Sequence, residues 1–301
     1  MINKNLEFAE VYIMQKAIEN WIKTNEAIKN TLYHYTNHET MQKILIKRGP
    51  VFRFTRWDEF KDKNEGKHIS NIYKTTCDNL LRNKKISREF YELIIGYQAN
   101  REYLLDYNMR KTTAYVACFS RNNNSDYMWN NYTKDEDNIK SNLGINLRSG
   151  SAEFLQNIKK EKHVGFEILE IIYSDQEKIE LLSDYIRQYY ALFKNNCNHD
   201  DIKNGLEDIL SRYSLGFKEE NYQMEEETRI IINVDSDSIN NEEFKYIEFH
   251  EDEKYLYYYS DCPDCVIRRT YYHNNPPEAI KKEFETGYGY VCDVFPNKDR
   301  Q

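Results

Sequence analysis

The chain has 301 residues, of which 40% are hydrophobic and 14% aromatic, and its formal net charge at pH 7 is −8. This composition predicts a globular protein with a sizeable core and excludes a disordered chain. Six cysteines are too few for a secreted disulfide framework, and no run of about 18 apolar residues suits a membrane span. We therefore expect a cytoplasmic protein with reduced thiols and no membrane partner.

Charge and glycine content also limit the classes of ligand. The acidic balance disfavours nucleic acid as a partner, although a local basic groove could form around Arg53, Arg56, Lys61 and Lys63. Glycine is scarce, and the sequence contains neither a dinucleotide-binding glycine fingerprint nor a phosphate-binding loop. A ligand that carries phosphate groups would therefore need another kind of phosphate-binding structure.

Hydrophobic periodicity predicts helices and strands in alternating blocks. Apolar positions at helical spacing over 5–29 indicate an amphipathic helix, so that residues 1–30 form an N-terminal helix ahead of a single α+β domain over 31–301. A strand at 32–35, a helix that ends at Gly49–Pro50, and a strand at 51–55 should follow.

The rest of the chain predicts strands separated by helical insertions. The insertions are expected at about 68–110 and 175–215, and a further helix at 276–286. The expected strands are 113–119, 143–147, 165–173, 228–234, 254–259, 266–272 and 288–294. This order predicts an α+β fold with a mixed or antiparallel sheet.

Three short segments place a chemically able side chain on or beside a predicted strand. They are Leu32–Thr36, Val116–Ser120 and Met224–Ile232, which carry His34, Ser120 and a run of three glutamates. Strands that hold a histidine, a serine and a carboxylate in one cleft would form a candidate site.

The order of these segments resembles the bacterial domain-of-unknown-function family 2971. The resemblance covers about residues 31–235 and rests on the motifs LYHYT at 32–36, FRFT at 52–55, WDEF at 57–60, EG at 65–66, CFS at 118–120, MWNNY at 128–132, GI at 144–145, IY at 172–173 and EEETRI at 225–230. Two positions depart from the family pattern. The chain has Phe60-Lys61-Asp62-Lys63 where the family has an Asn-Asp-Pro turn, and Thr228 where it has an aromatic residue.

The His, Ser and Glu pattern is in turn similar to the ADP-ribosyltransferase superfamily, whose split sheet binds NAD as a substrate. The resemblance implies that His34 bonds the adenosine ribose, that Ser120 organises the nicotinamide pocket, and that Glu227 is the catalytic carboxylate with Glu225 beside it. It implies ADP-ribose transfer or NAD hydrolysis, with protein, nucleic acid or water as the acceptor. Bacterial proteins of this kind often serve as toxins or anti-phage effectors.

Physical chemistry agrees with these roles. Cleavage of the nicotinamide glycosidic bond develops oxocarbenium charge on the ribose, which a nearby carboxylate stabilises. Alternation along a strand would point Glu225 and Glu227 to the same side. Arg53 or Arg229 could bind a pyrophosphate, and three aromatic side chains could stack on a ring. The expected NAD-binding residues are His34, Tyr35, Thr36, Arg53, Ser120, Trp129, Tyr132 and Arg229.

Each of these residues also has a structural explanation. His34 could be a strand histidine bonded to a carbonyl, Ser120 could cap the loop at 121–124, and the acids could form an ion pair with Arg229. The aromatic residues could belong to the core. The same cleft could then serve a non-catalytic module that binds a nucleotide or a protein partner.

Two alternative interpretations of the sequence involve a bound metal ion. Asp58 followed by Glu65-Gly66-Lys67 is similar in spacing to a magnesium-dependent nuclease. Cys262 and Cys265 could bind zinc if Cys197 and His199 completed the four ligands. Apart from these alternatives, no metal is expected.

Overall fold

The computed structural model describes residues 31–44, 51–60, 68–95, 112–133, 140–146, 158, 160–239, 243–259, 269–272, 277–287 and 291–294. They fall into two compact units. The helical unit comprises the described residues of 61–112 and 171–222, and the sheet unit comprises those of 24–60, 113–170 and 223–301. The N-terminal helix predicted over 1–30 lies outside the described residues.

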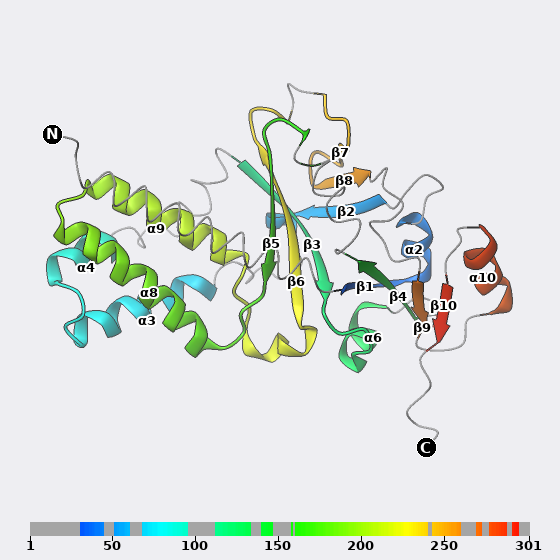
Figure 1. Cartoon of the computed structure of the whole chain (residues 1–301), viewed down its shortest axis with the longest axis horizontal. Coiled ribbons are helices and arrows are strands. Elements are labelled where there is room, and N and C mark those ends of the chain that lie inside the picture. The colour runs from blue at the N-terminus through cyan, green and yellow to red at the C-terminus, as the bar shows by residue number, and fades with distance from the viewer. Residues whose placement is uncertain are drawn as a thin grey trace, which may run out of the picture. The chain divides into compact units, whose positions relative to one another are not determined.

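The sheet unit is built on an open sheet, and the chain has the α+β fold that the sequence predicts (Figure 1). Its strands follow the order β10-β9-β4-β1-β3-β2-β8-β7, and β5 pairs with β6, which pairs with β3. The strands are β1 (Thr31–Asn37), β2 (Val51–Arg56), β3 (Thr112–Ser120), β4 (Lys140–Asn146), β5 (Val164–Glu170), β6 (Glu227–Asp235), β7 (Ile247–His250), β8 (Tyr255–Tyr259), β9 (Arg269–Tyr272) and β10 (Val291–Val294). The β9–β10 pair is parallel, whereas β1, β2, β4, β5 and β8 make antiparallel pairs.

β3 has three partner strands. β1 meets it at Ser120, opposite Tyr33, whereas β2 meets it nearer its start, where Thr55 lies opposite Val116. β6 also pairs with β3, and the Arg121 N–H continues this pairing with a 3.0 Å hydrogen bond to the Glu226 carbonyl oxygen. Because a strand has only two edges, two of these three partners share one edge of β3.

One face of this sheet is buried against the hydrophobic core, and α2 (His38–Ile44) contributes Met41 and Ile44 to that core. The strand residues of the core include Leu32, Phe52, Phe54, Ala117, Phe119, Ile230, Ile232 and Val234. Side chains alternate along a strand, so the residues between them point to the other side. We call that side of β2, β3 and β6 the polar face; it carries Arg53, Cys118, Ser120, Glu227 and Arg229.

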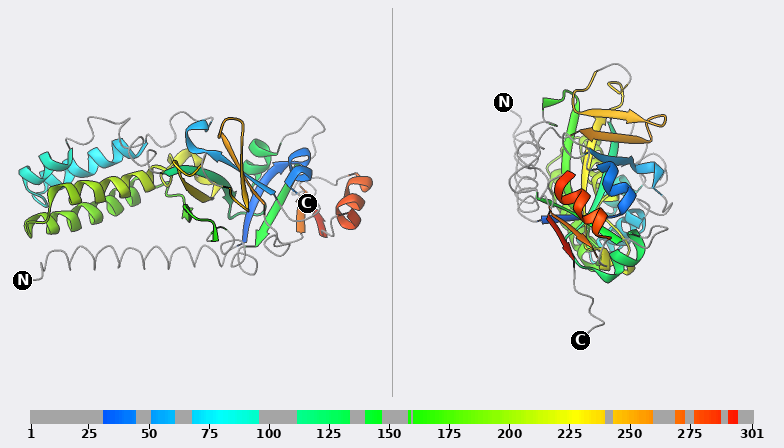
Figure 2. Two further views of the ribbon diagram at one scale, coloured as in Figure 1. Left: turned by 90° about the horizontal axis from the view of Figure 1, so that it is seen from above. Right: turned by 90° about the vertical axis from the view of Figure 1, so that its right-hand side faces the viewer.

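The helical unit contains four amphipathic helices. They are α3 (His68–Arg82), α4 (Arg88–Ile95), α8 (Asp175–Lys194) and α9 (His199–Ser214). α3 lies against α4, α8 and α9 in all views (Figures 1 and 2). The buried Phe90 of α4 packs against rings of α8, with centroids 5.1 Å from Tyr190 and 5.2 Å from Phe193. None of the helices in the described ranges is long and apolar enough to cross a membrane.

Within the described residues, helices and strands follow the order that the sequence predicts, but several boundaries differ. Each predicted helical insertion is broken by a turn, and Lys84 and Asn196 have positive φ there. β4 begins at Lys140 rather than at 143, and β5 ends at 170 rather than at 173. The sequence analysis missed β7 and α6 (Asp126–Tyr132).

The predicted 276–286 helix is found as α10 (Glu278–Lys282) followed by a π-helical turn (Glu283–Gly287). β9 and β10 lie within the strands predicted at 266–272 and 288–294, whose first residues are outside the described ranges.

Candidate functional site

The two predicted catalytic carboxylates do not lie on one strand. Glu225 is the last residue of the 3-10 helix η3 (Glu220–Glu225), and β6 begins at Glu227. Between them Glu226 has a φ of +45°, in the left-handed region. The prediction that strand alternation gives Glu225 and Glu227 a common face is therefore wrong, because the backbone turns at Glu226.

Glu227 forms an ion pair with Arg229 on the polar face. The Arg229 Nε donates to Glu227 Oε1 at 2.7 Å and an Nη to Oε2 at 3.4 Å. The two side chains are 5% and 1% exposed, and the guanidinium lies 5.6 Å from the centroid of the Phe60 ring. Arg229 thus balances the charge of Glu227 inside the protein, as the structural alternative for these acids predicts.

Glu225 is bound by an aromatic residue that reaches the surface. The Tyr132 hydroxyl, at the end of α6, donates a 2.6 Å hydrogen bond to Glu225 Oε1. Tyr132 is 46% exposed, whereas Glu225 is 2% exposed. This carboxylate therefore lies just beneath a surface aromatic side chain.

Ser120 lies at the end of β3 and organises the loop that follows it. Its buried Oγ accepts a 3.1 Å hydrogen bond from the Asn122 N–H, so it caps the loop as its structural alternative predicts. The Tyr35 hydroxyl donates to the Asn122 carbonyl oxygen at 2.8 Å and accepts from the Ser125 N–H at 2.9 Å. The Tyr35 hydroxyl therefore links β1 to this loop.

Two asparagines of this loop complete the network, and the sequence analysis did not single them out. Asn122 Nδ2 donates to Glu226 Oε1 at 2.9 Å, and Asn122 Oδ1 accepts from the Asn124 N–H at 2.9 Å. Asn124 Oδ1 in turn accepts from the Trp129 indole N–H at 3.0 Å. The sequence signal that could have indicated this loop is Ser125, which caps the N-terminus of α6. Its Oγ accepts a hydrogen bond from the Met128 N–H, as the side chain of an N-cap serine usually does.

Tyr35, Thr36 and Trp129 are buried in this arrangement. The Tyr35 and Trp129 rings meet edge to face at 4.9 Å and form a small core with Met128. Burial raises the pKa of Tyr35, so its hydroxyl stays protonated. In this structure these side chains support the loop from beneath.

His34 is held through one ring nitrogen. Nδ1 lies 3.1 Å from the Cys118 carbonyl oxygen, which can only accept, so Nδ1 carries the proton. Burial lowers the pKa of His34, and the positive charge of Arg53 lowers it further, although the hydrogen bond acts in the opposite direction. The ring is therefore neutral at pH 7, with Nε2 as an acceptor.

The structure separates His34 from the other strand residues of the predicted site. Alternation places it on the same side of β1 as Leu32, and its ring centroid lies 5.5 Å from that of Phe119, a core residue. Ser120, Glu227 and Arg229 share the polar face instead. Arg53 and Cys118 are the exposed members of that face, and the Arg53 guanidinium lies 4.7 Å from the centroid of the Tyr255 ring.

With this geometry in place, the comparisons with known proteins can be stated. Residues 128–230 match the family described as Protein of unknown function (DUF2971). The DUF2971 match begins in α6 and ends in β6, so it includes Trp129, Tyr132, Glu225, Glu227 and Arg229. It supports the resemblance read from the sequence motifs. Neither the curated proteins nor the solved structures contain a match to this chain.

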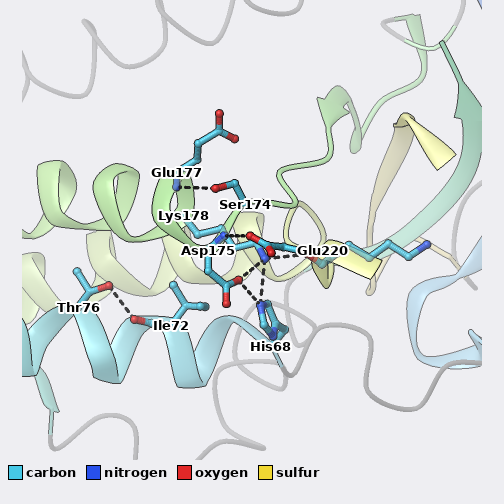
Figure 3. Close-up of polar contacts among 9 residues, drawn as sticks. His68, Ile72, Thr76, Ser174, Asp175, Glu177, Lys178 and Glu220 are labelled. Carbon is cyan, nitrogen blue, oxygen red and sulfur yellow. Dashed lines mark hydrogen bonds and ion pairs between the residues drawn. The ribbon is translucent and has the colours of Figure 1, made fainter. Parts of the chain in front are cut away.

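A second polar cluster lies in the helical unit, around a lysine of the DUF2971 segment (Figure 3). The fully buried Lys178 Nζ donates to Asp175 Oδ1 at 2.8 Å and to the Lys218 carbonyl oxygen at 2.8 Å, and lies 3.0 Å from His68 Nε2. The Asp175 N–H donates to Glu220 Oε1 at 3.2 Å. Hydrogen bonds from Lys178 and His68 lower the pKa of Asp175. Because the ammonium has three partners, the cluster fastens helices together.

The described residues do not provide the ligands of either alternative metal site. Among them, no group of three or more His, Cys, Asp or Glu side chains is placed to hold a metal ion. Asp58 instead accepts from Arg56 Nε at 2.6 Å. Glu65, Lys67, Cys262 and Cys265 lie outside the described residues, so both alternatives remain expectations from sequence.

Proposed function

We propose that the sheet unit binds NAD or a related nucleotide and cleaves its nicotinamide–ribose bond, with transfer of ADP-ribose to an acceptor or to water. The observation that carries this proposal is the pairing of Glu225 with Tyr132. It holds a carboxylate beside a partly exposed aromatic side chain, with a second carboxylate two residues further on. A carboxylate close to the ribose is what formation of an oxocarbenium-like transition state requires.

Glu225 suits the charge-stabilising role better than Glu227. The nicotinamide leaves as a neutral base, and the positive charge that grows on the ribose needs a negative charge close by. The charge of Glu227 is already balanced by Arg229 at 2.7 Å. Glu225 accepts a 2.6 Å hydrogen bond from Tyr132, a neutral donor whose ring reaches the surface, and we assign it the charge-stabilising role on this pairing.

The remaining residues divide the binding of the nucleotide. Arg53 is an exposed guanidinium and suits a pyrophosphate, whereas the buried Arg229 serves Glu227. His34 lies on the core side of β1, away from the polar face, so we give it no role in binding this nucleotide. Tyr132 offers the exposed ring for stacking, because Tyr35 and Trp129 are buried.

A non-catalytic nucleotide-binding module is the second candidate. The Glu227–Arg229 ion pair favours it, because a carboxylate engaged by a buried cation is a common structural element and fold likeness does not establish catalysis. Such a module would bind NAD stoichiometrically and release no nicotinamide.

Nicotinamide release from NAD by the purified full chain tests the proposal, with cell RNA, DNA and protein offered as acceptors. E225Q should lower kcat by about 10²–10³, the usual effect of removing one transition-state charge stabiliser. E92Q, at an exposed glutamate of α4, serves as the control for the amide substitution. Calorimetric titration with NAD runs beside the turnover assay.

The outcomes separate the two candidates. Release that E225Q abolishes supports the enzyme. Binding of NAD without release, equal in wild type and E225Q, supports the binding module. Absence of both binding and release rejects NAD as the ligand.

A further inference from the structure

Glu226 has a backbone conformation that its side chain does not favour. Its φ of +45° lies in the left-handed region, which residues with a Cβ seldom adopt outside turns. Residues in such conformations persist only where their surroundings fix them, and they cluster at functional sites. Here the strained residue stands between Glu225 and Glu227, so its conformation sets how these two carboxylates are placed.

Three hydrogen bonds hold Glu226 in this conformation, and a fourth fixes Asn122, one of its partners. Its N–H donates to the Gln223 carbonyl oxygen at 3.1 Å, and its carbonyl oxygen accepts from the Arg121 N–H at 3.0 Å. Its side-chain Oε1 accepts from Asn122 Nδ2 at 2.9 Å. The fourth is indirect, because the Asn122 N–H is itself held by Ser120 Oγ at 3.1 Å.

Asn122 is the residue in which these constraints meet. Its backbone and side chain join Ser120 of β3, Tyr35 of β1 and Glu226. The Asn122–Glu226 bond has a carboxylate acceptor, and bonds of that kind are stronger than those between neutral groups. A change at Asn122 therefore reaches Glu225 and Glu227 through the backbone of Glu226.

We infer that Asn122 is a positioning residue for the candidate carboxylates: it anchors Glu226 in the left-handed conformation that sets the relative placement of Glu225 and Glu227. The inference rests on the proposed function for its effect on turnover. Asn122 acts through Glu226 and has no contact of its own with Glu225 or Glu227 among its hydrogen bonds.

Two substitutions of Glu226 separate its backbone from its carboxylate. E226A and E226G remove the same side-chain acceptor, but only glycine adopts a positive φ without a steric penalty. E226G should keep at least about tenfold more turnover than E226A, because a displacement of about 1 Å can cost 10²-fold in rate. E226G should also unfold at a higher denaturant concentration than E226A. K84G supplies the control for relief of a positive φ in the helical unit.

Substitution of Asn122 tests the anchor itself. N122A should lower kcat by about 10–100-fold, with the KM for NAD changed less than about threefold. N124A is the matched control, since Asn124 lies in the same loop and bonds Trp129 rather than Glu226. N124A should keep kcat within about threefold of wild type. In the E226G background N122A should cost much less, because glycine needs no anchor.

Each outcome decides one statement. Wild-type turnover with equal kcat values for N122A and N124A overturns the inference while the proposed function stands. Equal unfolding midpoints for E226A and E226G overturn the backbone argument, whether or not the protein turns over NAD. Absence of nicotinamide release by the wild type overturns the proposed function, and the catalytic part of the inference falls with it.

Discussion

The sheet unit and the helical unit each bury a cation, but they satisfy it differently. Arg229 in the sheet unit is 1% exposed and pairs with a carboxylate that is equally hidden, with the Glu227 side chain 5% exposed. Lys178 in the helical unit has no exposed side-chain area, and its carboxylate partner Asp175 is 52% exposed. A carbonyl and an imidazole complete the set around Lys178.

The difference shows that burial of a charged residue does not by itself mark a functional site. Lys178 Nζ donates to Asp175 and to the Lys218 carbonyl oxygen and lies 3.0 Å from His68 Nε2 of α3, so groups of the protein surround its ammonium. Arg229 instead holds the carboxylate of Glu227. Glu227 is two residues after Glu225, whose carboxylate accepts a hydrogen bond from the partly exposed Tyr132. The partners of the buried charge are therefore more informative than its burial.

Arg229→Met should have the largest effect on stability. It leaves the Glu227 carboxylate buried without its cation, which costs about 3–5 kcal/mol for such pairs. Urea unfolding followed by tryptophan fluorescence measures this, because Trp129 lies in the sheet unit. The double variant Glu227→Gln/Arg229→Met removes both charges and should be more stable than Arg229→Met. A double variant that is less stable would contradict the comparison.

Lys178→Met should cost less, about 1.5–3 kcal/mol, the range for hydrogen bonds to charged groups. The Asp175 carboxylate left behind is half-exposed and can be hydrated, so no isolated buried charge remains. Unfolding followed by far-UV circular dichroism reports on the helical unit. A cost as large as that of Arg229→Met would show that the exposed half of Asp175 contributes nothing to its solvation.

Glu207→Met should stabilise the helical unit. Glu207 of α9 is 2% exposed, and within the described residues neither carboxylate oxygen has a hydrogen-bond partner. Burial raises its pKa above the ordinary 4.5, so the folded protein binds more protons than the unfolded chain, and stability falls as the pH rises through that window. At pH 7 the apolar variant should gain about 1–3 kcal/mol. Equal pH profiles for wild type and variant would refute this.

The smallest expected effect concerns His34. Burial lowers its pKa below the ordinary 6.5, so the unfolded chain takes up a proton that the folded protein resists. The free energy of unfolding should therefore fall as the pH drops below 6.5. His34→Gln should flatten this fall, as urea titrations from about pH 7 to about pH 5 would show. A steeper fall in the variant would contradict the assignment of the neutral ring.

Most strands could be predicted because they are rich in β-branched and aromatic residues, as in β6, where three consecutive isoleucines are buried. β4 was placed too late because Lys140, Ser141 and Asn142 are polar, yet their backbones pair with β1. β7 has only four residues, too few for a clear alternation. In these places backbone pairing decides the structure, and side-chain pattern does not report it.

The sequence analysis named candidate site residues but did not predict their geometry. Three consecutive acids before an isoleucine-rich stretch suggested a continuous strand, and nothing in those letters indicates the turn at Glu226. The role of Asn122 depends on contacts with residues 87 positions earlier and 104 positions later in the chain. A local pattern cannot contain such contacts.

The three partners of β3 also bear on how the chain is made. During synthesis β1 and β2 precede β3, but β6 emerges only after about a hundred further residues, which include α8 and α9. Until then the pairing of β3 with β6 is missing, and an unpaired strand edge invites contact with other chains. The helices in between can complete their local contacts during that delay. Ribosome-bound chains that stop short of Glu227 should therefore carry a helical region ahead of an unfinished sheet, and the nascent protein is most vulnerable to aggregation in that interval.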